Sequence, residues 1–256
     1  MGDDVKLKLI QKIAKFADKY YEEHLGNIRV DELKNDWWEA LKFFFSKAFY
    51  QGRRDEISYR VQKAAEEVLG YYFNNPQTKD QNFDLLKRQN WKQLIDKLKE
   101  KIGKGKVGRK RDIEMIKSTL DFISRIPDKN IVNYSVKKIK NGELKSLWKE
   151  LLKIYSVGEK VASFYLRDLV ALLHLESDIH DGLEYLQPID TWVRKMCKIC
   201  KIEGENDKEL REKIVQICKK SNISPIKFNM GAWYVATHAL FILINLLEQD
   251  VGGIYE

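Results

Sequence analysis

The chain has 256 residues, of which 44% are hydrophobic, so it can bury a substantial core and is not a disordered chain. It carries 46 Lys and Arg against 38 Asp and Glu, which gives a net charge of +8. This surplus favours a polyanionic partner such as nucleic acid, although a protein whose charges are merely solvated would show the same surplus. No apolar run approaches the ~20 residues of a membrane span and the first residues hold no signal core, so we expect a soluble, cytoplasmic protein with no membrane partner.

Helical periodicity dominates the chain from its first residues onward. Apolar residues spaced three and four apart predict a helix from Leu7 to Tyr20, and the same pattern recurs at 38–49 and 61–69. Further helices are predicted at 91–102, 109–125, 144–155, 159–175, 190–200, 207–219 and 230–248. Four tryptophans fit core or interface positions of helices, namely Trp37, Trp38, Trp91 and Trp148. Because strand-like alternation is scarce, we expect an all-α fold.

Two connections between these helices are unusual. Residues 103–111, of sequence GKGKVGRKR, form a glycine-rich basic loop that lacks the residue order of a nucleotide-binding P-loop. Lys106 and Arg109 in this loop could contact the backbone of DNA, or the loop could be a flexible basic surface. The second connection, 176–187, is polar and ends at Pro188, so we place the boundary between two parts of the fold beside it.

The segment most informative about function is 151–167, which predicts a helix, a tight turn and a second helix. Ser156, Val157 and Gly158 close the turn, and Lys160 follows at the start of the second helix. In such a hairpin the backbone N–H groups of the turn and of the helix start point outward. There they can hold a DNA phosphate without reading the bases.

A second informative segment, Pro188-Ile189-Asp190, follows the hairpin in the chain. It predicts an extended entry into another helix, with Asp190 near the start of that helix. The positive end of the helix dipole favours a carboxylate at this position.

Together, Val157-Gly158-Glu159-Lys160-Val161-Ala162 and Pro188-Ile189-Asp190 resemble the signature of the helix-hairpin-helix DNA glycosylases. The resemblance implies that Lys160 is the Schiff-base nucleophile and that Asp190 is the catalytic carboxylate. The sequence departs from that family at Ser156, where glycine is usual.

The same resemblance implies a two-lobed fold whose active site lies in the cleft between the lobes. We expect a helical barrel at 35–172, which includes the hairpin at 144–175. We expect the second lobe to be built from both ends of the chain, 1–34 and 173–256.

Within that superfamily the chain is most similar to the archaeal 8-oxoguanine DNA glycosylases, the AGOG family. The linker between Lys160 and Asp190 is long, and no iron–sulfur cysteine set follows it. Residues 223–233 resemble the terminal helix of that family. The resemblance therefore implies 8-oxoguanine as the excised base.

The AGOG resemblance also assigns a base-binding pocket. It implies that the extruded base is stacked between Phe164 and Trp233, with Pro188 lining the pocket. Gln11 corresponds to the glutamine that reads the base, and Asn229 stands where an aspartate is usual. The sequence holds no secure counterpart for a further pocket tryptophan.

The chemistry of base excision fits these residues. A base inside a duplex hides its glycosidic bond, so the enzyme must extrude the nucleotide into a pocket. Cleavage develops positive charge on the sugar, which an ionised Asp190 would stabilise. A neutral Lys160 would attack C1′, and the resulting imine allows strand cleavage by loss of a proton from C2′. We therefore expect a bifunctional 8-oxoguanine glycosylase and AP lyase of base excision repair, acting as a monomer on double-stranded DNA without a cofactor.

Two alternatives remain open. The first is a glycosylase for another damaged or mismatched base. The second is a non-catalytic helix-hairpin-helix module in which Lys160 only touches phosphate. The presence of Asp190 argues against the second, because binding alone has no use for a carboxylate beside DNA.

Two groups of possible metal ligands are interpreted as structural. Cys197-x-x-Cys200 has metal-ligand spacing, but Cys218 is the one further cysteine, so we expect buried thiols beside Met196, Ile199 and Ile217. Asp178, His180 and Asp181 could also ligate a metal, but we interpret them as part of a polar loop. We expect no metal.

Overall fold

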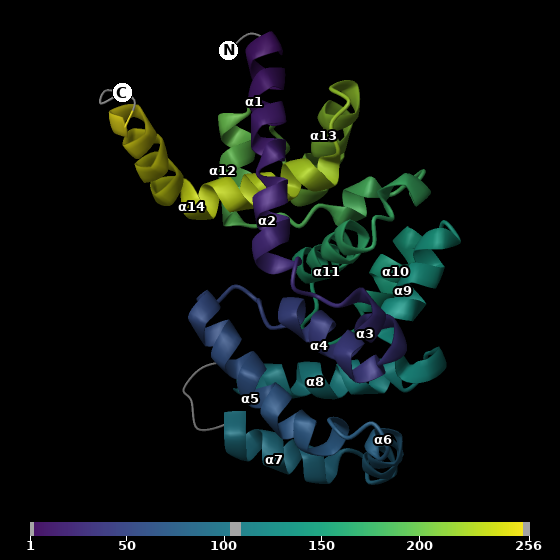
Figure 1. Cartoon of the computed structure of the whole chain (residues 1–256). Coiled ribbons are helices and arrows are strands. Elements are labelled where there is room, and N and C mark those ends of the chain that lie inside the picture. The colour runs from purple at the N-terminus through teal and green to yellow at the C-terminus, as the bar shows by residue number, and fades with distance from the viewer. Residues whose placement is uncertain (1–2, 103–108, 253–256) are drawn as a thin grey trace. The chain divides into compact units, whose positions relative to one another are not determined.

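The computed structural model describes residues 3–102 and 109–252. These residues form α-helices, three short 3-10 helices and the turns between them, and include no strand, so the all-α prediction is confirmed (Figure 1). Within the described part of the chain, no helix is both long and apolar enough to cross a membrane.

The chain divides into two compact units. Unit 1 comprises Met1–Ile28, Val170–Glu176 and His180–Glu256, and unit 2 comprises Arg29–Leu169 and Ser177–Ile179. The sequence placed the corresponding boundaries at 34/35 and 172/173. That these units are glycosylase lobes enclosing a cleft stays a prediction.

Unit 2 is built around a strongly apolar helix. Its helices are α3 (Val30–Asn35), α4 (Trp37–Ala48), α5 (Asp55–Phe73), α6 (Lys79–Arg88), α7 (Lys92–Ile102), α8 (Arg109–Ile123), η1 (Pro127–Lys129), α9 (Ile131–Lys140), α10 (Leu144–Leu151) and most of α11 (Glu159–Leu172). Helix α4 packs against α3, α5 and α9. Because aromatic and aliphatic residues lie on most sides of α4, it can only be stable in the interior.

Four tryptophans of unit 2 lie in this interior, as the sequence predicted. Each is at most 7% exposed, and each indole N–H donates a hydrogen bond to a polar side chain. The donors are Trp37, Trp38, Trp91 and Trp148, and their acceptors are, in the same order, Asp80, Asn74, Asp121 and Ser163. The four indole rings are thus buried, and none of their N–H groups is left without an acceptor.

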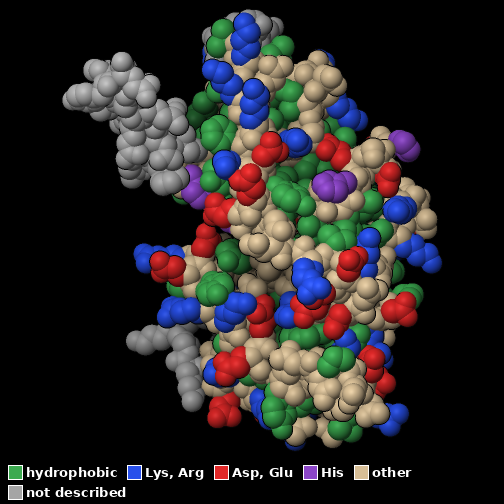
Figure 2. Space-filling model, viewed as in Figure 1, with side chains coloured by type: hydrophobic (Ala, Val, Ile, Leu, Met, Phe, Trp, Pro, Cys, Tyr) green, Lys and Arg blue, Asp and Glu red, His purple; other side chains and the backbone are tan. Residues whose placement is uncertain are grey.

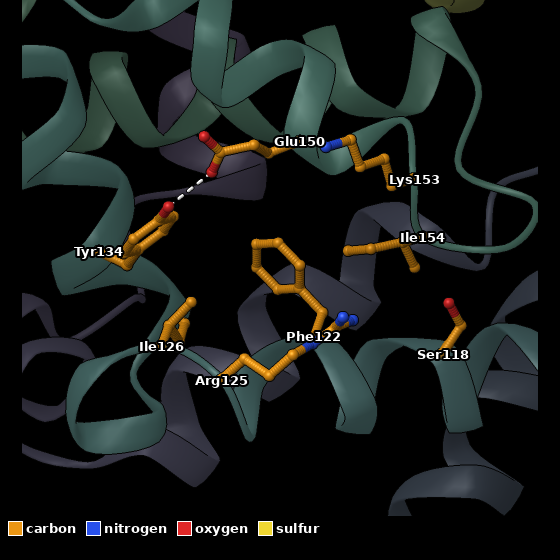
Figure 3. A pocket seen from close by; sticks show the side chains of 8 residues that line it. All are labelled: Ser118, Phe122, Arg125, Ile126, Tyr134, Glu150, Lys153 and Ile154. Atoms are coloured by element: carbon orange, nitrogen blue, oxygen red, sulfur yellow. Dashed lines mark hydrogen bonds between the residues drawn. The ribbon is translucent and has the colours of Figure 1, made fainter.

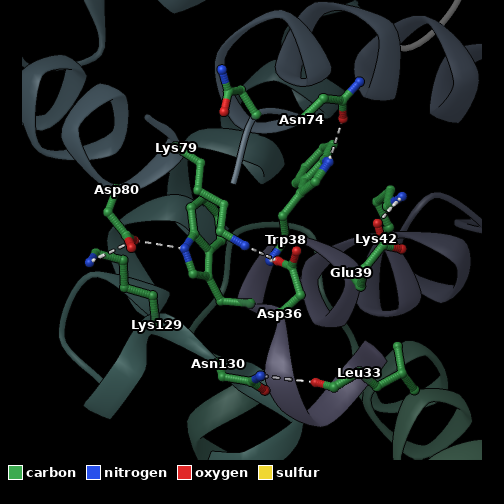
Figure 4. Close-up of polar contacts among 12 residues, drawn as sticks. Leu33, Asp36, Trp38, Glu39, Lys42, Asn74, Lys79, Asp80, Lys129 and Asn130 are labelled. Atoms are coloured by element: carbon green, nitrogen blue, oxygen red, sulfur yellow. Dashed lines mark hydrogen bonds and ion pairs between the residues drawn. The ribbon is translucent and has the colours of Figure 1, made fainter. Parts of the chain in front are cut away.

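Polar side chains fix the start of α4 (Figure 4). Asp36 caps the helix by accepting a hydrogen bond from the backbone N–H of Trp38 at 2.8 Å, and it pairs with Lys79 at 2.5 Å. Asn130, which caps α9, donates to the carbonyl of Leu33 at 2.9 Å. These contacts hold α3, α6 and α9 around α4.

Unit 1 contains the two ends of the chain. Its helices are α1 (Asp3–Lys15), α2 (Ala17–His24), η3 (Leu183–Leu186), α12 (Thr191–Ile199), α13 (Asp207–Lys220) and α14 (Pro225–Gly252), and the short helix η2 (Glu176–Asp178) begins at its edge. Helix α14 packs against α1, α2, α12 and α13. Helices α14 and α1 cross closely at Gly231, because a Cβ atom there would lie 2.0 Å from the carbonyl oxygen of Ile13.

The structure corrects several expected helices. The helix expected from Leu7 to Tyr20 is two helices, α1 and α2, separated at Phe16. Helices α3, α6 and α9 were not expected. Helix α3 has six residues, too few for a periodic pattern, and the buried apolar residues of α6 are only Phe83 and Leu86. Helix α9 begins with β-branched residues, which weaken a helical prediction.

Candidate active site

The helix, turn and second helix predicted here are present as α10, the turn 152–158 and α11, whereas their hairpin arrangement stays a prediction. The backbone N–H of Val157 donates to the carbonyl of Ile154 at 3.0 Å, and the carbonyl of Gly158 accepts from Ala162 at 3.0 Å. Gly158 is exposed, and a Cβ atom there would meet nothing within 4 Å. The first N–H groups of an α-helix have no partner within the helix, so those of α11 need partners from outside it.

Ser156 shows how the turn tolerates its departure from glycine. Its φ of 66° lies in the left-handed region that glycine adopts without strain. The hydroxyl donates to Oε1 of Gln51 at 2.9 Å and accepts a hydrogen bond from Nε of Arg111. These two bonds tie the turn to the loop after α4 and to α8, and they offset the strain of a non-glycine residue.

Lys160 is the second residue of α11 and is half-buried. It makes no hydrogen bond or ion pair with any residue that the structure describes. Phe164 lies one helical turn further on, and helical side chains lean toward the N-terminus of their helix. The amine of Lys160 and the ring of Phe164 therefore lie on the same face of α11.

Two cations support the ring of Phe164. Nζ of Lys47 and Cζ of Arg167 each lie 5.0 Å from its centroid. Asp168 binds both of them: Oδ2 is 2.7 Å from Nζ of Lys47, and Oδ1 is 2.7 Å from Nη2 of Arg167. Burial by itself would raise the pKa of Asp168, but Arg167 and Lys47 outweigh it and hold that pKa below its usual range.

The sequence analysis missed this group of buried charges. A signal for it exists, because Lys47 follows three consecutive phenylalanines of an apolar helix and Arg167-Asp168 interrupt the apolar face of α11. A charge in such a position is rarely buried unless it is paired. Pairing across 120 residues, however, could not be assigned without the structure.

The start of α8 lies beside the hairpin turn, since Arg111 reaches Ser156. Asp112, which is buried, anchors this end of α8 through a bidentate pair with Arg53 at 2.7 and 2.9 Å. Of the two residues predicted to contact the DNA backbone here, Arg109 is the first residue of α8, and Lys106 lies outside the described residues. A basic helix start therefore adjoins the turn.

In unit 1, Asp190 caps α12 as the sequence suggested. Its Oδ1 accepts a hydrogen bond from the backbone N–H of Val193 at 2.8 Å. Pro188 and Ile189 are buried, whereas Asp190 is half-exposed. The second carboxylate oxygen of Asp190 has no hydrogen-bond partner in the described part of the chain, so it can face a ligand.

Asn229 supports this segment from α14. It is fully buried, and its Nδ2 donates to the carbonyl of Pro188 at 3.3 Å. The preceding Gln187 is also fully buried and donates to the carbonyl of Leu183 at 3.2 Å. The amide group of Asn229 thus fixes Pro188, which is two residues before Asp190.

Trp233 is half-buried one turn further along α14. Its ring makes edge contacts with Tyr20 and His24 of α2, with centroids 5.6 and 5.3 Å away. Sequence analysis assigned neither of these neighbours a role at the site. Gln11, the predicted base-reading residue, is exposed on α1, so its role stays a prediction without structural support.

The three cysteines lie in the core of unit 1, as predicted. Burial raises the pKa of the thiol of Cys197 to about 12, of Cys200 to about 11 and of Cys218 to about 12, so they stay protonated at neutral pH. Ile199, expected beside them, is instead 58% exposed, which corrects that detail. Asp178, His180 and Asp181 are all exposed.

A pocket of about 230 Å³ lies next to the hairpin in unit 2 (Figure 3). Tyr134 and Glu150 face each other across one side of it, and the tyrosine hydroxyl donates to the carboxylate at 2.5 Å. Burial and this bond raise the pKa of Tyr134, so the hydroxyl remains a donor at neutral pH. The pocket includes Lys153 and Ile154 of the turn but none of the predicted site residues.

Positive charge is unevenly distributed. In Figure 2, Lys and Arg side chains gather over α1, whereas elsewhere on that face they alternate with Asp and Glu. The exposed lysines of α1 include Lys8, Lys12 and Lys15.

The predicted site residues thus form two groups in different units. The lysine group contains Ser156, Gly158, Lys160 and Phe164, and the aspartate group contains Pro188, Asp190, Asn229 and Trp233. Comparison of the chain with models of protein families, with characterised proteins and with solved structures gave no match. The functional argument therefore depends on the residues themselves.

Proposed function

We propose that the chain is a bifunctional DNA glycosylase and AP lyase of the helix-hairpin-helix type, which excises 8-oxoguanine from double-stranded DNA. The observation that carries this proposal is Lys160: it lies directly after the turn, as the second residue of α11, and no described carboxylate pairs with its amine. A carboxylate partner would hold the amine as an ammonium ion, which cannot act as a nucleophile.

The reaction uses Lys160 in two steps. Nζ forms a bond to C1′ as the bond from C1′ to the base breaks, and the base leaves with the bonding electrons and takes up a proton. The sugar then opens to an imine on Lys160. Loss of a proton from C2′ breaks the bond to the 3′ oxygen and cleaves the strand.

Asp190 acts on the charge that develops on the sugar. Its position as the cap of α12 fixes the carboxylate, and its second oxygen has no described partner. A fixed anion stabilises the cationic sugar without reorganisation during the reaction. Asn229 supports Asp190 indirectly by holding the carbonyl of Pro188.

The remaining residues bind the DNA. We expect the N–H group of Gly158 and those at the start of α11 to hold a backbone phosphate, with the basic start of α8 adding to this contact. The N–H of Val157 is already bonded to the carbonyl of Ile154, which argues against the DNA contact predicted for it. Phe164 and Trp233 are the residues that we expect to stack on the extruded base. The choice of 8-oxoguanine follows from the resemblance of their positions to the AGOG pocket.

Trapping with borohydride tests the proposal. On a duplex with one 8-oxoguanine, the wild-type protein should form a reduced cross-link and a nick, and Lys160→Gln should form neither. Loss of one positive charge removes about one phosphate-type contact, so the DNA affinity of this variant should change little. Lys149→Gln, on the exposed surface of α10, is the matched control and should behave as the wild type.

The alternatives have different outcomes in the same assay. Cross-linking on duplexes with another lesion, but not on 8-oxoguanine, would assign a different base. Binding without any cross-link would instead support the non-catalytic DNA-binding module. A nick at the wild-type rate with Lys160→Gln would place the nucleophile elsewhere.

A further inference from the structure

Helix α12 exposes an apolar stripe beside Asp190. Trp192 is 41% exposed and Ile199 is 58% exposed, although Val193, Met196 and Cys197 of the same helix are buried in the core of unit 1. Residues 192, 195 and 199 are spaced three and four apart and so lie on one side of the helix. We refer to Trp192, Lys195, Lys198 and Ile199 as the α12 face.

Cations dominate this face. Segment 191–201 contains Lys195, Lys198 and Lys201 and no acidic residue, whereas its Arg194 is paired with Asp207. Nζ of Lys195 lies 4.4 Å from the centroid of the Trp192 ring. Lys6 of α1 donates to the carbonyl of Lys201 at 3.0 Å, which brings one more cation to the end of α12.

The combination of an exposed indole and neighbouring cations fits one class of ligand. A single nucleic-acid strand offers bases whose faces stack on aromatic rings and phosphates that attract lysine. A duplex keeps its bases stacked on each other and offers Trp192 nothing to stack on. We propose that the α12 face binds a single DNA strand, with Trp192 stacked on an unpaired base. The inference extends the proposed function, because extrusion of a nucleotide creates unpaired DNA close to Asp190.

The fluorescence of the protein reports on Trp192 directly. Four of the six tryptophans are at most 7% exposed and Trp233 is half-buried, so Trp192 is the tryptophan most accessible to a ligand. Titration with an oligothymidylate of about 16 nucleotides should quench the wild-type emission. Trp192→Phe keeps a stacking ring but removes the fluorophore. It should lose most of the quenching while its affinity, measured with a labelled oligonucleotide, stays close to the wild-type value.

Trp192→Ala removes the stacking ring and should weaken binding of the labelled oligonucleotide about 5- to 100-fold. Lys195→Gln should weaken it less and reduce the dependence on salt. Tyr71→Ala is the control for an exposed aromatic elsewhere, since Tyr71 is 76% exposed on α5 of unit 2. Its affinity should equal that of the wild type.

Unchanged affinity of Trp192→Ala, or wild-type quenching of Trp192→Phe, would overturn the inference. So would a response of Trp192 to vesicles of anionic lipid but not to the oligonucleotide. The borohydride assay is read separately. Cross-linking with no role for Trp192 refutes this inference alone, whereas quenching through Trp192 without cross-linking refutes the glycosylase proposal and leaves the strand-binding face standing.

Discussion

The close crossing of α14 over α1 can be tested by Gly231→Ala. A Cβ atom at Gly231 would lie 2.0 Å from the carbonyl oxygen of Ile13, a distance that must reach at least 3.0 Å, so the two backbones must separate by about 1 Å (3.0 − 2.0). The obstacle is backbone, which cannot move aside as a side chain can. Overpacking of this kind costs ~1–3 kcal/mol or more.

Alanine also favours a helix over glycine by roughly 1 kcal/mol, which opposes the effect of the clash. Because the separation affects the whole contact between α1 and α14, we expect the clash to dominate, with a net loss of about 2 kcal/mol in the free energy of unfolding. For a urea m-value of about 2 kcal/mol/M, the unfolding midpoint should fall by about 1 M.

Urea unfolding followed by circular dichroism measures this loss, and hydrogen exchange should show that it is concentrated in α1 and α14. Gly158→Ala is the matched control, because a Cβ atom there meets nothing within 4 Å. Its stability should fall by less than about 1 kcal/mol, because alanine caps a helix somewhat less well than glycine. If Gly231→Ala were as stable as the wild type, the helices could not cross as closely as described.

Three further predictions concern charged groups and thiols. Asp190→Asn should lower base excision by about 10²–10³-fold in a single-turnover assay yet leave the thermal midpoint nearly unchanged, because asparagine also caps a helix. Asp168→Asn should lower the free energy of unfolding at pH 7 by ~3–5 kcal/mol. The folded state lowers the pKa of Asp168. The contribution of Asp168 to the free energy of unfolding is therefore full above its unfolded pKa of about 3.9 and is lost as the pH falls through its folded pKa. Acid titration should accordingly destabilise the wild type more steeply than the variant. Cys197, Cys200 and Cys218 should resist a thiol reagent at pH 8 until the protein unfolds, and fast labelling of the native protein would contradict their burial.

Periodicity was sufficient to predict most of the helices, because a stripe of apolar residues is needed wherever a helix packs on a core. Helix α4 and the buried tryptophans illustrate this. The pattern fails where few residues are buried, as in α6, and where two helices continue one stripe, as α1 and α2 do across Phe16. The break at Phe16 interrupts the helix without changing the spacing of its apolar residues.

The local geometry of the candidate site was also partly predictable. The cap at Asp190 follows from a Pro-led segment before a helix, and the hairpin turn follows from residues 156–158. Contacts between distant segments were not predictable, since nothing in the order of residues assigns Lys47 to Asp168 or Tyr20 to Trp233. Such pairs depend on how helices cross, which single-sequence patterns do not encode.

The pairing of buried cations with carboxylates in unit 2 bears on the proposed chemistry of Lys160. Where unit 2 buries a cation, it supplies a carboxylate, as in Lys47 with Asp168, Lys79 with Asp36 and Arg53 with Asp112. Such pairing is required because an unpaired buried charge is strongly destabilising. Lys160 is half-buried on the same helix as Asp168, yet no described residue pairs with it. In the proposed reaction this isolation has a consequence, because the amine must be neutral to attack C1′ and a carboxylate partner would hold it as an ammonium ion.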